Sequence, residues 1–328
     1  MPKPKVFISR KIPGDCIQRL KKKYKVKIYP KDQIIPRKDL IKGVKWCDAL
    51  LCILTEKIDK EVLDANPKLK VVSNYAVGYN NIDVEYATKK GIVICNTPSQ
   101  QVVDAVAEHT FALMLGIAKR LHEDEEYVRE HKWKSWAPEL LLGTQVIGKT
   151  LGVVGLGRIG HGVASRAKCM GMNVIYSDIR KDRGFERRYK AKKVSLKTLL
   201  KTADFVTLHV PLLKSTYHLI STKEFKLMKP TAYIINTSRG PVIDERALVK
   251  ALQYRKIAGA GLDVHETEPS HDHALHRLDN CILTPHVASA TVEVREQMSK
   301  DSADNIISVL SNKKPKKIVN HKVWKKRR

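Results

Sequence analysis

The stretch from Thr150 to Asp178, TLGVVGLGRIGHGVASRAKCMGMNVIYSD, decides the fold. It begins with an apolar run typical of a buried strand, and Gly155, Gly157 and Gly160 then form the pattern G-x-G-x-x-G. A helix-compatible segment and a second apolar run follow, and Asp178 lies 18 residues after the third glycine. The glycine pattern alone is weak evidence. With a strand before it, a helix after it and an acid at this distance, it predicts a strand–helix–strand unit that binds a dinucleotide.

Each glycine of this pattern has a physical role in binding a dinucleotide. Gly155 allows a tight turn, Gly157 lets the backbone approach a pyrophosphate, and Gly160 lets the helix pack closely on the strand. The unpaired N–H groups at the start of the helix then bind the anion.

The acid and the cations that follow it determine which dinucleotide we expect. Asp178 can accept hydrogen bonds from the adenosine ribose and repels a 2′-phosphate, which favours NAD. Arg180, Lys181 and Arg183 leave NADP open, because a nearby cation can bind the extra phosphate.

Apolar runs alternate with helix-compatible segments on both sides of this stretch, a pattern that predicts parallel sheets. The first series of predicted strands comprises KVFIS, YKVKIYP, DALLCIL, LKVVSNYAV and IVICNTP. The second comprises TLGVVG, MNVIYSD, ADFVTLHV, TAYIINTS, AGAGLDV and CILTPH. We predict a long buried helix over 102–121, an irregular connector over 131–150 and an amphipathic helix over 292–310. The simplest architecture is an α/β protein of two doubly wound parallel-sheet domains joined near residue 100.

Composition narrows the class of protein. The 328 residues are 43% hydrophobic, and no stretch reaches the roughly 20 apolar residues that a membrane helix needs. The N-terminus lacks a signal-peptide core, and the six scattered cysteines form no C-x-x-C pair. We therefore expect a cytoplasmic protein with free thiols. The net charge of +27 suggests affinity for nucleic acid or an anionic membrane. Without a recognition motif, however, it favours basic solvated surfaces, so we expect neither partner.

Polar residues follow three strands of the second series. Arg239 ends INTSRG, Asp263 and Glu268 lie in LDVHETEP, and His286 follows LTP. The carboxyl ends of parallel strands share one edge, where ligands bind in such sheets. The sequence therefore predicts that Arg239, Glu268 and His286 lie on the same edge as the glycine pattern.

Many ordered motifs together resemble the D-isomer-specific 2-hydroxyacid dehydrogenase family, most closely its glyoxylate/hydroxypyruvate reductase branch. They are NYAVGYNNID, NTP, VAEHTFALML, KWKSWAPELLLGTQVIGKTLGVVGLGRIG, LHVPL, INTSRGPVIDE, GAGLDVHETEP and LTPHVASAT. The resemblance implies an NAD-binding Rossmann domain over 100–289. It also implies a flavodoxin-like substrate domain over 1–99 plus 290–328, with an active-site cleft between the two domains.

The resemblance implies that Arg239, Glu268 and His286 are the catalytic residues. Arg239 can bind the substrate carboxylate and polarise the keto oxygen. Imidazole gains and loses a proton near neutral pH, so His286 can donate a proton during reduction and take it back during oxidation. Glu268 is expected to orient His286 and favour its protonated form.

Further site residues are implied by the same resemblance. The cofactor residues are Gly155, Gly157, Arg158, Ile159, Gly160, Asp178, His209, Pro211, Thr237 and Asp263. The backbone of Ala76, Val77 and Gly78, together with Arg239, is expected to bind the substrate. A homodimer built on the 100–150 segment is also implied, in which Trp136 reaches the active site of the partner. Near NTP, where the family often has a threonine, this chain has Val102 and Val103. Gln100 or Gln101 replaces that hydroxyl contact, or the contact is missing.

The histidine-rich stretch after Glu268 is interpreted as a surface loop. His271 and His273 have a spacing compatible with zinc, and His276 follows. Neither a second ligand pair nor a cysteine accompanies them, so we expect no metal site. His265 is interpreted as structural.

We therefore expect an NAD(P)H-dependent reductase that converts a small 2-keto acid, glyoxylate or hydroxypyruvate, to the D-2-hydroxy acid. The sequence leaves 3-phosphoglycerate dehydrogenase and D-lactate dehydrogenase open as alternatives. A non-catalytic NAD-binding regulator is the alternative outside the enzymes.

Overall fold

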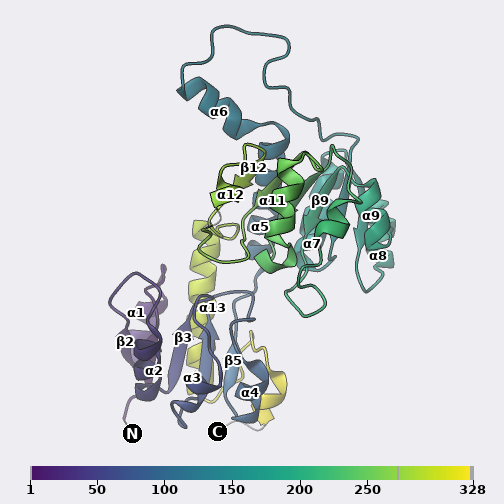
Figure 1. The fold of residues 1–328 in the computed structure, drawn as a ribbon. Helices are drawn as coiled ribbons and strands as arrows, with labels where there is room; N and C mark the ends of the chain where they lie inside the picture. Colours follow the sequence, from purple (N-terminus) through teal and green to yellow (C-terminus); the bar gives the residue numbers. More distant parts are fainter. Residues whose placement is uncertain (1, 272, 326–328) are drawn as a thin grey trace. The chain divides into compact units, whose positions relative to one another are not determined.

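The computed structural model describes residues 2–271 and 273–325, and they form two compact units. Unit 1 comprises Met1–Val102 and Ala290–Arg328, and unit 2 comprises Val103–Ser289. Each unit is built on one parallel sheet with helices on both faces, which confirms the predicted α/β class (Figure 1).

Unit 1 has a five-stranded sheet in the order β2-β1-β3-β4-β5, the flavodoxin-like order. Its strands are β1 (Lys5–Ile8), β2 (Lys25–Ile28), β3 (Ala49–Cys52), β4 (Val71–Asn74) and β5 (Val93–Cys95). Its helices are α1 (Cys16–Lys23), α2 (Arg37–Trp46), α3 (Lys60–Asp64), α4 (Val84–Lys89) and α13 (Val292–Leu310), with the 3-10 helix η2 (His321–Lys325). The three strands from β3 to β5 are buried along their whole length, as expected for a parallel sheet covered on both faces.

The two faces of the unit 1 sheet bury different residues. Phe7, Leu50 and Val72 pack with residues of α2, α3 and α4. On the other face, α13 contacts β3, β4 and β5 and also packs against α1. The C-terminal helix is therefore part of the core of the unit that the N-terminus begins.

Unit 2 has a seven-stranded sheet in the order β12-β11-β10-β9-β6-β7-β8. Its strands are β6 (Thr150–Val154), β7 (Asn173–Ser177), β8 (Lys192–Lys193), β9 (Phe205–Leu208), β10 (Tyr233–Asn236), β11 (Gly259–Leu262) and β12 (Cys281–Leu283). Numbered within the unit, the order is 7-6-5-4-1-2-3, the Rossmann order with one additional strand. All pairings are parallel, and the order reverses between β6 and β9.

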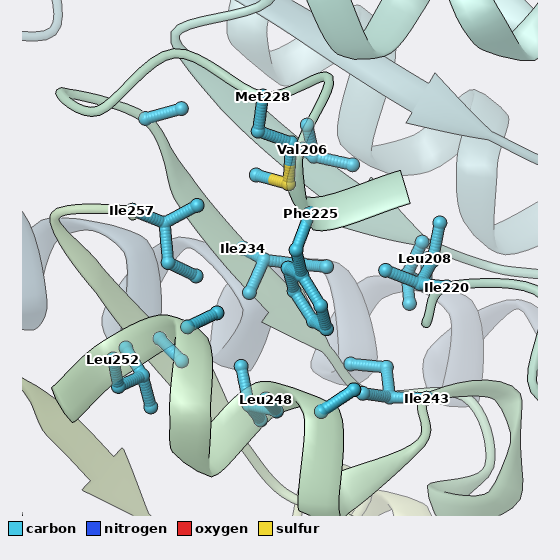
Figure 2. Packing of buried hydrophobic residues seen from close by; sticks show 14 of the residues in the cluster. Val206, Leu208, Ile220, Phe225, Met228, Ile234, Ile243, Leu248, Leu252 and Ile257 are labelled. Carbon is cyan, nitrogen blue, oxygen red and sulfur yellow. The ribbon is translucent and has the colours of Figure 1, made fainter. Parts of the chain in front are cut away.

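Two apolar clusters cover the faces of the unit 2 sheet. The helices of this unit are α5 (Gln100–Ala118), α6 (Leu121–Arg129), α7 (Arg158–Cys169), α8 (Arg183–Tyr189), α9 (Leu196–Thr202), α10 (Thr222–Phe225), α11 (Glu245–Gln253) and α12 (His273–His276), with the 3-10 helix η1 (Gly240–Val242). Figure 2 shows one cluster, in which Leu248 and Leu252 of α11 face Val206 and Ile234 of the sheet. On the other face, α5 and α7 pack against β6 and β7.

Side-chain caps explain where many of these helices begin. The caps of α3, α4, α9, α11 and α13 accept a hydrogen bond from a backbone N–H of the first turn. These caps are Asp59, Asp83, Ser195, Asp244 and Thr291. A cap of this kind stabilises a helix by about 1 kcal/mol.

The predicted buried helix over 102–121 differs from the structure in one respect. α5 ends at Ala118, and α6 begins at Leu121 after Arg120 adopts a left-handed conformation with φ 59°. By length and composition α5 could cross a membrane, but two thirds of its apolar window is buried in the protein. It packs in the core of unit 2, with Phe111 and Met114 among its buried residues. All six cysteines are free.

Candidate active site

The glycine turn joins β6 to α7 in a conformation that needs glycine. Gly155 has φ 91°, a region that other residues rarely adopt. A Cβ at Gly160 would lie 2.1 Å from the backbone oxygen of Gly155, so a larger residue would separate helix and strand. No atom lies within 4 Å of a Cβ built at Gly157, which caps α7 and is exposed. The helix N-terminus is therefore open to an anionic ligand.

Asp178 closes this turn from the end of β7. Its Oδ2 accepts a hydrogen bond of 2.7 Å from the backbone N–H of Leu156, and its Oδ1 accepts one of 2.8 Å from that of Arg180. The carboxylate is half-buried beside the turn, where the ribose of a dinucleotide binds in this type of fold. Arg158, Arg180 and Arg183 are exposed.

The residues present fit a nicotinamide dinucleotide. Gly155 and Gly157 follow β6, Asp178 follows β7, and His209 follows β9, so all four lie at carboxyl ends of adjacent strands. Ligands of doubly wound sheets bind along this edge, at the point where the strand order reverses. That point lies between β6 and β9.

The three predicted catalytic residues follow the next three strands of the same edge. Arg239 lies after β10, Glu268 after β11 and His286 after β12, and these strands are neighbours in the sheet. They therefore continue the edge that the glycine turn begins, all within unit 2.

His286 and Glu268 form a direct pair. Nδ1 of His286 lies 2.8 Å from Oε2 of Glu268, and about a third of each side chain is exposed. The other oxygen of Glu268 accepts a hydrogen bond of 3.2 Å from the backbone N–H of His265. Burial raises the pKa of Glu268, but the hydrogen bond and charge of His286 and the His265 N–H outweigh it, so the pKa lies below its usual value. Glu268 is therefore ionised at neutral pH and leaves Nε2 of His286 as the ring nitrogen available to a substrate.

Arg239 brings a half-buried positive charge beside this pair. Burial lowers the pKa of its guanidinium, and the negative charge of Glu268 opposes that shift, so the two charges interact. Nη1 of Arg239 donates a hydrogen bond of 2.6 Å to the backbone oxygen of Ser238. A Cβ at Gly240 would lie 1.8 Å from the backbone oxygen of His265. Only glycine after Arg239 therefore allows this turn to pack against the loop that carries Glu268.

Asp263 holds the segment that carries His286. Its side chain is fully buried, and its carboxylate accepts hydrogen bonds of 2.8 Å from the backbone N–H groups of Val287 and Ala288. Thr284 donates to it at 2.6 Å, and Nε2 of His109 lies 3.4 Å away. Burial raises the pKa of Asp263, but these partners lower it below its usual value.

His286 itself has φ 56°, a left-handed conformation that is uncommon for a residue other than glycine. Its backbone N–H donates a hydrogen bond of 2.8 Å to the backbone oxygen of Asp263. Asp263 therefore constrains His286 through both its backbone and its side chain. The predicted contact between Asp263 and the cofactor stays a prediction.

Four other predicted cofactor residues lie along the same edge. Both ring nitrogens of His209 are buried without a hydrogen-bond partner among the described residues, and burial lowers its pKa to about 3, so this ring is neutral. Pro211 is exposed, and its backbone oxygen accepts a hydrogen bond from the Thr216 hydroxyl. Thr237 is buried, with its hydroxyl 3.0 Å from that of Thr110 on α5. Ile159 is half-buried in the first turn of α7.

The predicted substrate loop of unit 1, Ala76–Gly78, follows β4. All three of its backbone oxygens accept hydrogen bonds within the unit, from Thr97 N, Asn96 Nδ2 and Asn74 Nδ2 respectively. Asn74 also bonds Asn81 at 3.1 Å. These contacts fix the direction of the loop's peptide groups.

The histidine-rich stretch falls partly outside the described residues, because the side chain of His273 is not among them. His271 is exposed, and Nε2 of His276 lies 3.0 Å from the Ser270 hydroxyl. The described side chains contain no group of three His, Cys, Asp or Glu that could hold a metal ion. His265 is buried, and its ring bonds the backbone oxygen of Thr284, which agrees with the structural role expected for it.

Comparisons with known proteins show to which protein family the chain belongs. A sequence profile of the D-isomer specific 2-hydroxyacid dehydrogenase NAD-binding domain matches residues 111–288. The chain is 47% identical over 325 residues to a glyoxylate reductase of Thermococcus litoralis, which covers 98% of each chain. This chain belongs to the D-isomer-specific 2-hydroxyacid dehydrogenase family. The resemblance predicted from its motifs is confirmed, and the protein is an NAD(P)-dependent oxidoreductase.

Solved structures agree with this membership. A protein from Thermus thermophilus superposes with a TM-score of 0.91 at 38% identity, over 96% of this chain and 99% of that one. An NADPH-dependent glyoxylate/hydroxypyruvate reductase from Sinorhizobium meliloti, in complex with NADP and malonate, superposes with a TM-score of 0.85 at 29% identity, over 99% of each chain.

Sequence reasoning missed several residues that support the site of this dehydrogenase. His109 and Thr284, which contact Asp263, lie on separate elements. The motifs VAEHTFALML and LTPHVASAT contain them, but neither motif indicates that these two side chains meet at Asp263. His218, Glu245 and Glu266 form a second cluster beside the Glu268 loop. Glutamates are usually solvated, so their sequence positions carried no signal of burial.

Proposed function

We propose that this dehydrogenase reduces glyoxylate or hydroxypyruvate to the corresponding D-2-hydroxy acid, with Arg239, Glu268 and His286 as its catalytic residues. The observation that carries the proposal is the 2.8 Å pair of His286 and Glu268 beside the half-buried charge of Arg239. Relatives 44–47% identical to this chain are glyoxylate reductases, which supports the choice of substrate.

The proposed mechanism divides the work among three side chains. The nicotinamide supplies the hydride that reaches the carbonyl carbon. Arg239 pairs with the substrate carboxylate and polarises the keto oxygen, since its guanidinium remains charged at neutral pH. His286 donates the proton on Nε2 to the developing alkoxide. Glu268 holds Nδ1, which fixes the ring orientation and stabilises the imidazolium before transfer. In the oxidation direction, neutral His286 takes the proton back.

In unit 1 we propose the backbone N–H groups of Ala76, Val77 and Gly78 as ligands of the substrate carboxylate. Their backbone oxygens are occupied by Thr97, Asn96 and Asn74, which supports a fixed orientation of these peptides.

For the cofactor, we propose that NADH is preferred over NADPH. The Asp178 carboxylate beside the glycine turn disfavours a 2′-phosphate, and two backbone N–H groups hold it in place. Arg180 and Arg183 keep some NADPH activity possible. The predicted cofactor residues Gly155, Gly157, Arg158, Ile159, Gly160, His209, Pro211, Thr237 and Asp263 remain part of this proposal.

We further propose that the enzyme is a cytoplasmic homodimer that pairs through residues 121–147. Figure 1 shows α6 and the long loop after it extending away from the sheet of unit 2. α6 buries none of its residues. The exposed apolar side chains of this segment are Leu121, Val128, Trp133, Trp136, Leu142 and Ile147. An exposed apolar surface of this size is typical of a protein–protein interface.

The test is a substrate panel with the purified protein. Glyoxylate, hydroxypyruvate, pyruvate and 3-phosphohydroxypyruvate are each mixed with NADH or NADPH, and the loss of cofactor absorbance is followed. We expect the highest kcat/KM with NADH and either glyoxylate or hydroxypyruvate. A maximum with pyruvate or 3-phosphohydroxypyruvate would favour the D-lactate or 3-phosphoglycerate alternative. NADH binding without turnover of any acid would favour a non-catalytic regulator.

A further inference from the structure

Three carboxylates meet at the N-terminus of α11, outside the residues that the proposed mechanism uses. Asp244 caps the helix, Glu245 is its first residue, and the loop after β11 brings Glu266 against Glu245. The backbone N–H of Glu266 donates to Oε1 of Glu245 at 2.5 Å, and the backbone N–H of Glu245 donates to Oε2 of Glu266 at 3.1 Å. Each glutamate therefore binds the main chain of the other. We call this reciprocal pair the glutamate bracket.

Nearby groups compensate the charge of the bracket. Nε2 of His218 lies 2.7 Å from Oε1 of Glu266, and the N-terminus of a helix stabilises carboxylates. Burial raises the pKa of Asp244. The Ala247 N–H, the Ser221 hydroxyl and the charge of His218 have a larger combined effect, so the pKa of Asp244 lies below its usual value. Glu245 is buried. Removing a carboxylate from water costs free energy, a cost that an exposed glutamate avoids.

The bracket lies next to the pair of Glu268 and His286, because Glu266 is two residues before Glu268 in the same loop. Glu266 follows His265, whose backbone N–H donates to Glu268 at 3.2 Å and whose ring bonds the backbone oxygen of Thr284. The turn after Arg239 packs on the same peptide, because Gly240 lies directly against the backbone of His265 and Glu266. A shift of this peptide would therefore move Glu268 and Arg239 together.

We infer that Glu266, held by Glu245 and His218, is a positioning residue that fixes the loop of Glu268 and thereby the orientation of His286. This inference rests on the proposed roles of Glu268 and His286. A misplacement of about 1 Å can cost about 10²-fold in rate, so two partly buried hydrogen bonds that hold this loop are sufficient to affect the rate.

The test compares Glu266→Ala and Glu266→Gln with wild type in glyoxylate reduction. We expect Glu266→Ala to lower kcat by about 10²-fold, with the KM for NADH little changed. The alkaline limb of its kcat–pH profile should move in the same direction as in Glu268→Gln, because both variants weaken the contact between Glu268 and His286. Glu266→Gln keeps one carbonyl oxygen as an acceptor and should recover part of the rate.

Asp204→Asn is the matched control. Asp204 is also a partly buried carboxylate of unit 2, bonded to Lys229 Nζ at 2.9 Å and to the Thr150 N–H at 2.8 Å, but it precedes β9 and lies at the opposite end of the sheet. We expect it to lower Tm and leave the kcat–pH profile unchanged. If Glu266→Ala lowers Tm but keeps the wild-type kcat and profile, the bracket is purely structural and the inference is wrong.

A double variant keeps the inference testable if Glu266→Ala folds poorly. In a Glu268→Gln background, Glu266→Gln should lower kcat less than it does in wild type, since both act through one contact. Equal effects in the two backgrounds would overturn the inference.

His286→Ala distinguishes a failure of the proposed function from a failure of the inference about Glu266. Wild-type turnover in that variant would overturn the proposed function itself, whereas its inactivity beside a fully active Glu266→Ala would overturn only the inference.

Discussion

The proposed catalytic edge of unit 2 and the 121–147 segment present opposite kinds of surface. At the edge, Glu268, His286 and Asp263 are polar, partly or fully buried, and held by hydrogen bonds within the unit. In the 121–147 segment, large apolar side chains are exposed, with Trp136 at 81% and Trp133 at 59% of their full accessible area. We propose that a partner chain buries the second surface. Substitutions at the edge should therefore change the chemistry, and substitutions in the segment should change assembly.

The largest effect is expected at Arg239. Arg239→Ala removes the cation that polarises the keto oxygen, and kcat should fall by about 10²–10³-fold, the usual cost of losing one such donor. The measurement is NADH oxidation with saturating glyoxylate. Arg246→Ala, on the exposed face of α11, serves as the control and should retain wild-type turnover. Similar rates in both variants would show that the charge of Arg239 has no part in the mechanism.

Glu268→Gln is expected to have a smaller effect on rate. A hydrogen bond to a charged group contributes about 1.5–3 kcal/mol, so kcat at neutral pH should fall about 10–100-fold. The alkaline limb of the kcat–pH profile for reduction should move to lower pH, because the imidazolium loses its anionic partner. An unchanged profile would contradict the role of Glu268.

The same carboxylate makes stability depend on pH. The pKa of Glu268 is lower in the folded protein than its usual value, so its pairing stabilises the fold above that usual value. This contribution is lost as pH falls through the lower, folded-state pKa. In acid titrations of Tm, wild type should therefore lose more stability than Glu268→Gln below about pH 4. Parallel curves would contradict the lowered pKa.

Asp178→Asn should change the preference for the cofactor. Asparagine keeps an oxygen that can accept from the Leu156 N–H but removes the negative charge. The ratio of kcat/KM for NADPH to that for NADH should rise by about tenfold, which corresponds to about 1.4 kcal/mol. Asp182→Asn is the control, because Asp182 caps α8 and pairs with His161. An unchanged ratio would mean that Asp178 does not select the cofactor.

The smallest effect on chemistry and the clearest effect on assembly are expected in the 121–147 segment. Trp136→Ser should shift the protein from dimer toward monomer in analytical ultracentrifugation. The fold should change little, since an exposed substitution alters stability by about 0.5 kcal/mol or less. Tyr254→Ser, at another exposed aromatic residue of unit 2, should leave the mass unchanged. A monomeric wild-type protein in the same measurement would contradict the proposed dimer.

The sequence predicts the elements of this fold wherever side-chain pattern decides them. Apolar runs locate eleven of the twelve strands in the part of the chain that the structure describes, because most strands of these parallel sheets are buried. The two-residue strand β8 consists of two lysines, which carry no such pattern. The break between α5 and α6 was also missed, since Arg120 in a left-handed conformation has no sequence signal comparable to glycine or proline.

The sequence predicts those residues of the candidate site that directly follow a strand. The glycine turn and the residues Arg239, Glu268 and His286 are visible in the sequence because each follows an apolar run. Contacts between distant residues are not visible. Glu245 and Glu266 are bonded across 21 positions, and His109 lies 3.4 Å from Asp263 although α5 is far away in the sequence. Such pairs are created by packing, and only the folded structure reveals them.

The most direct test of the central claim is the turnover of glyoxylate with NADH by His286→Ala, beside its binding of NADH measured by fluorescence titration. Loss of a positioned acid typically costs about 10²–10⁴-fold. The account predicts a fall of that size in kcat while the Kd for NADH stays near that of wild type. Wild-type kcat in this variant would contradict it, because the proton for the alkoxide would then come from another group.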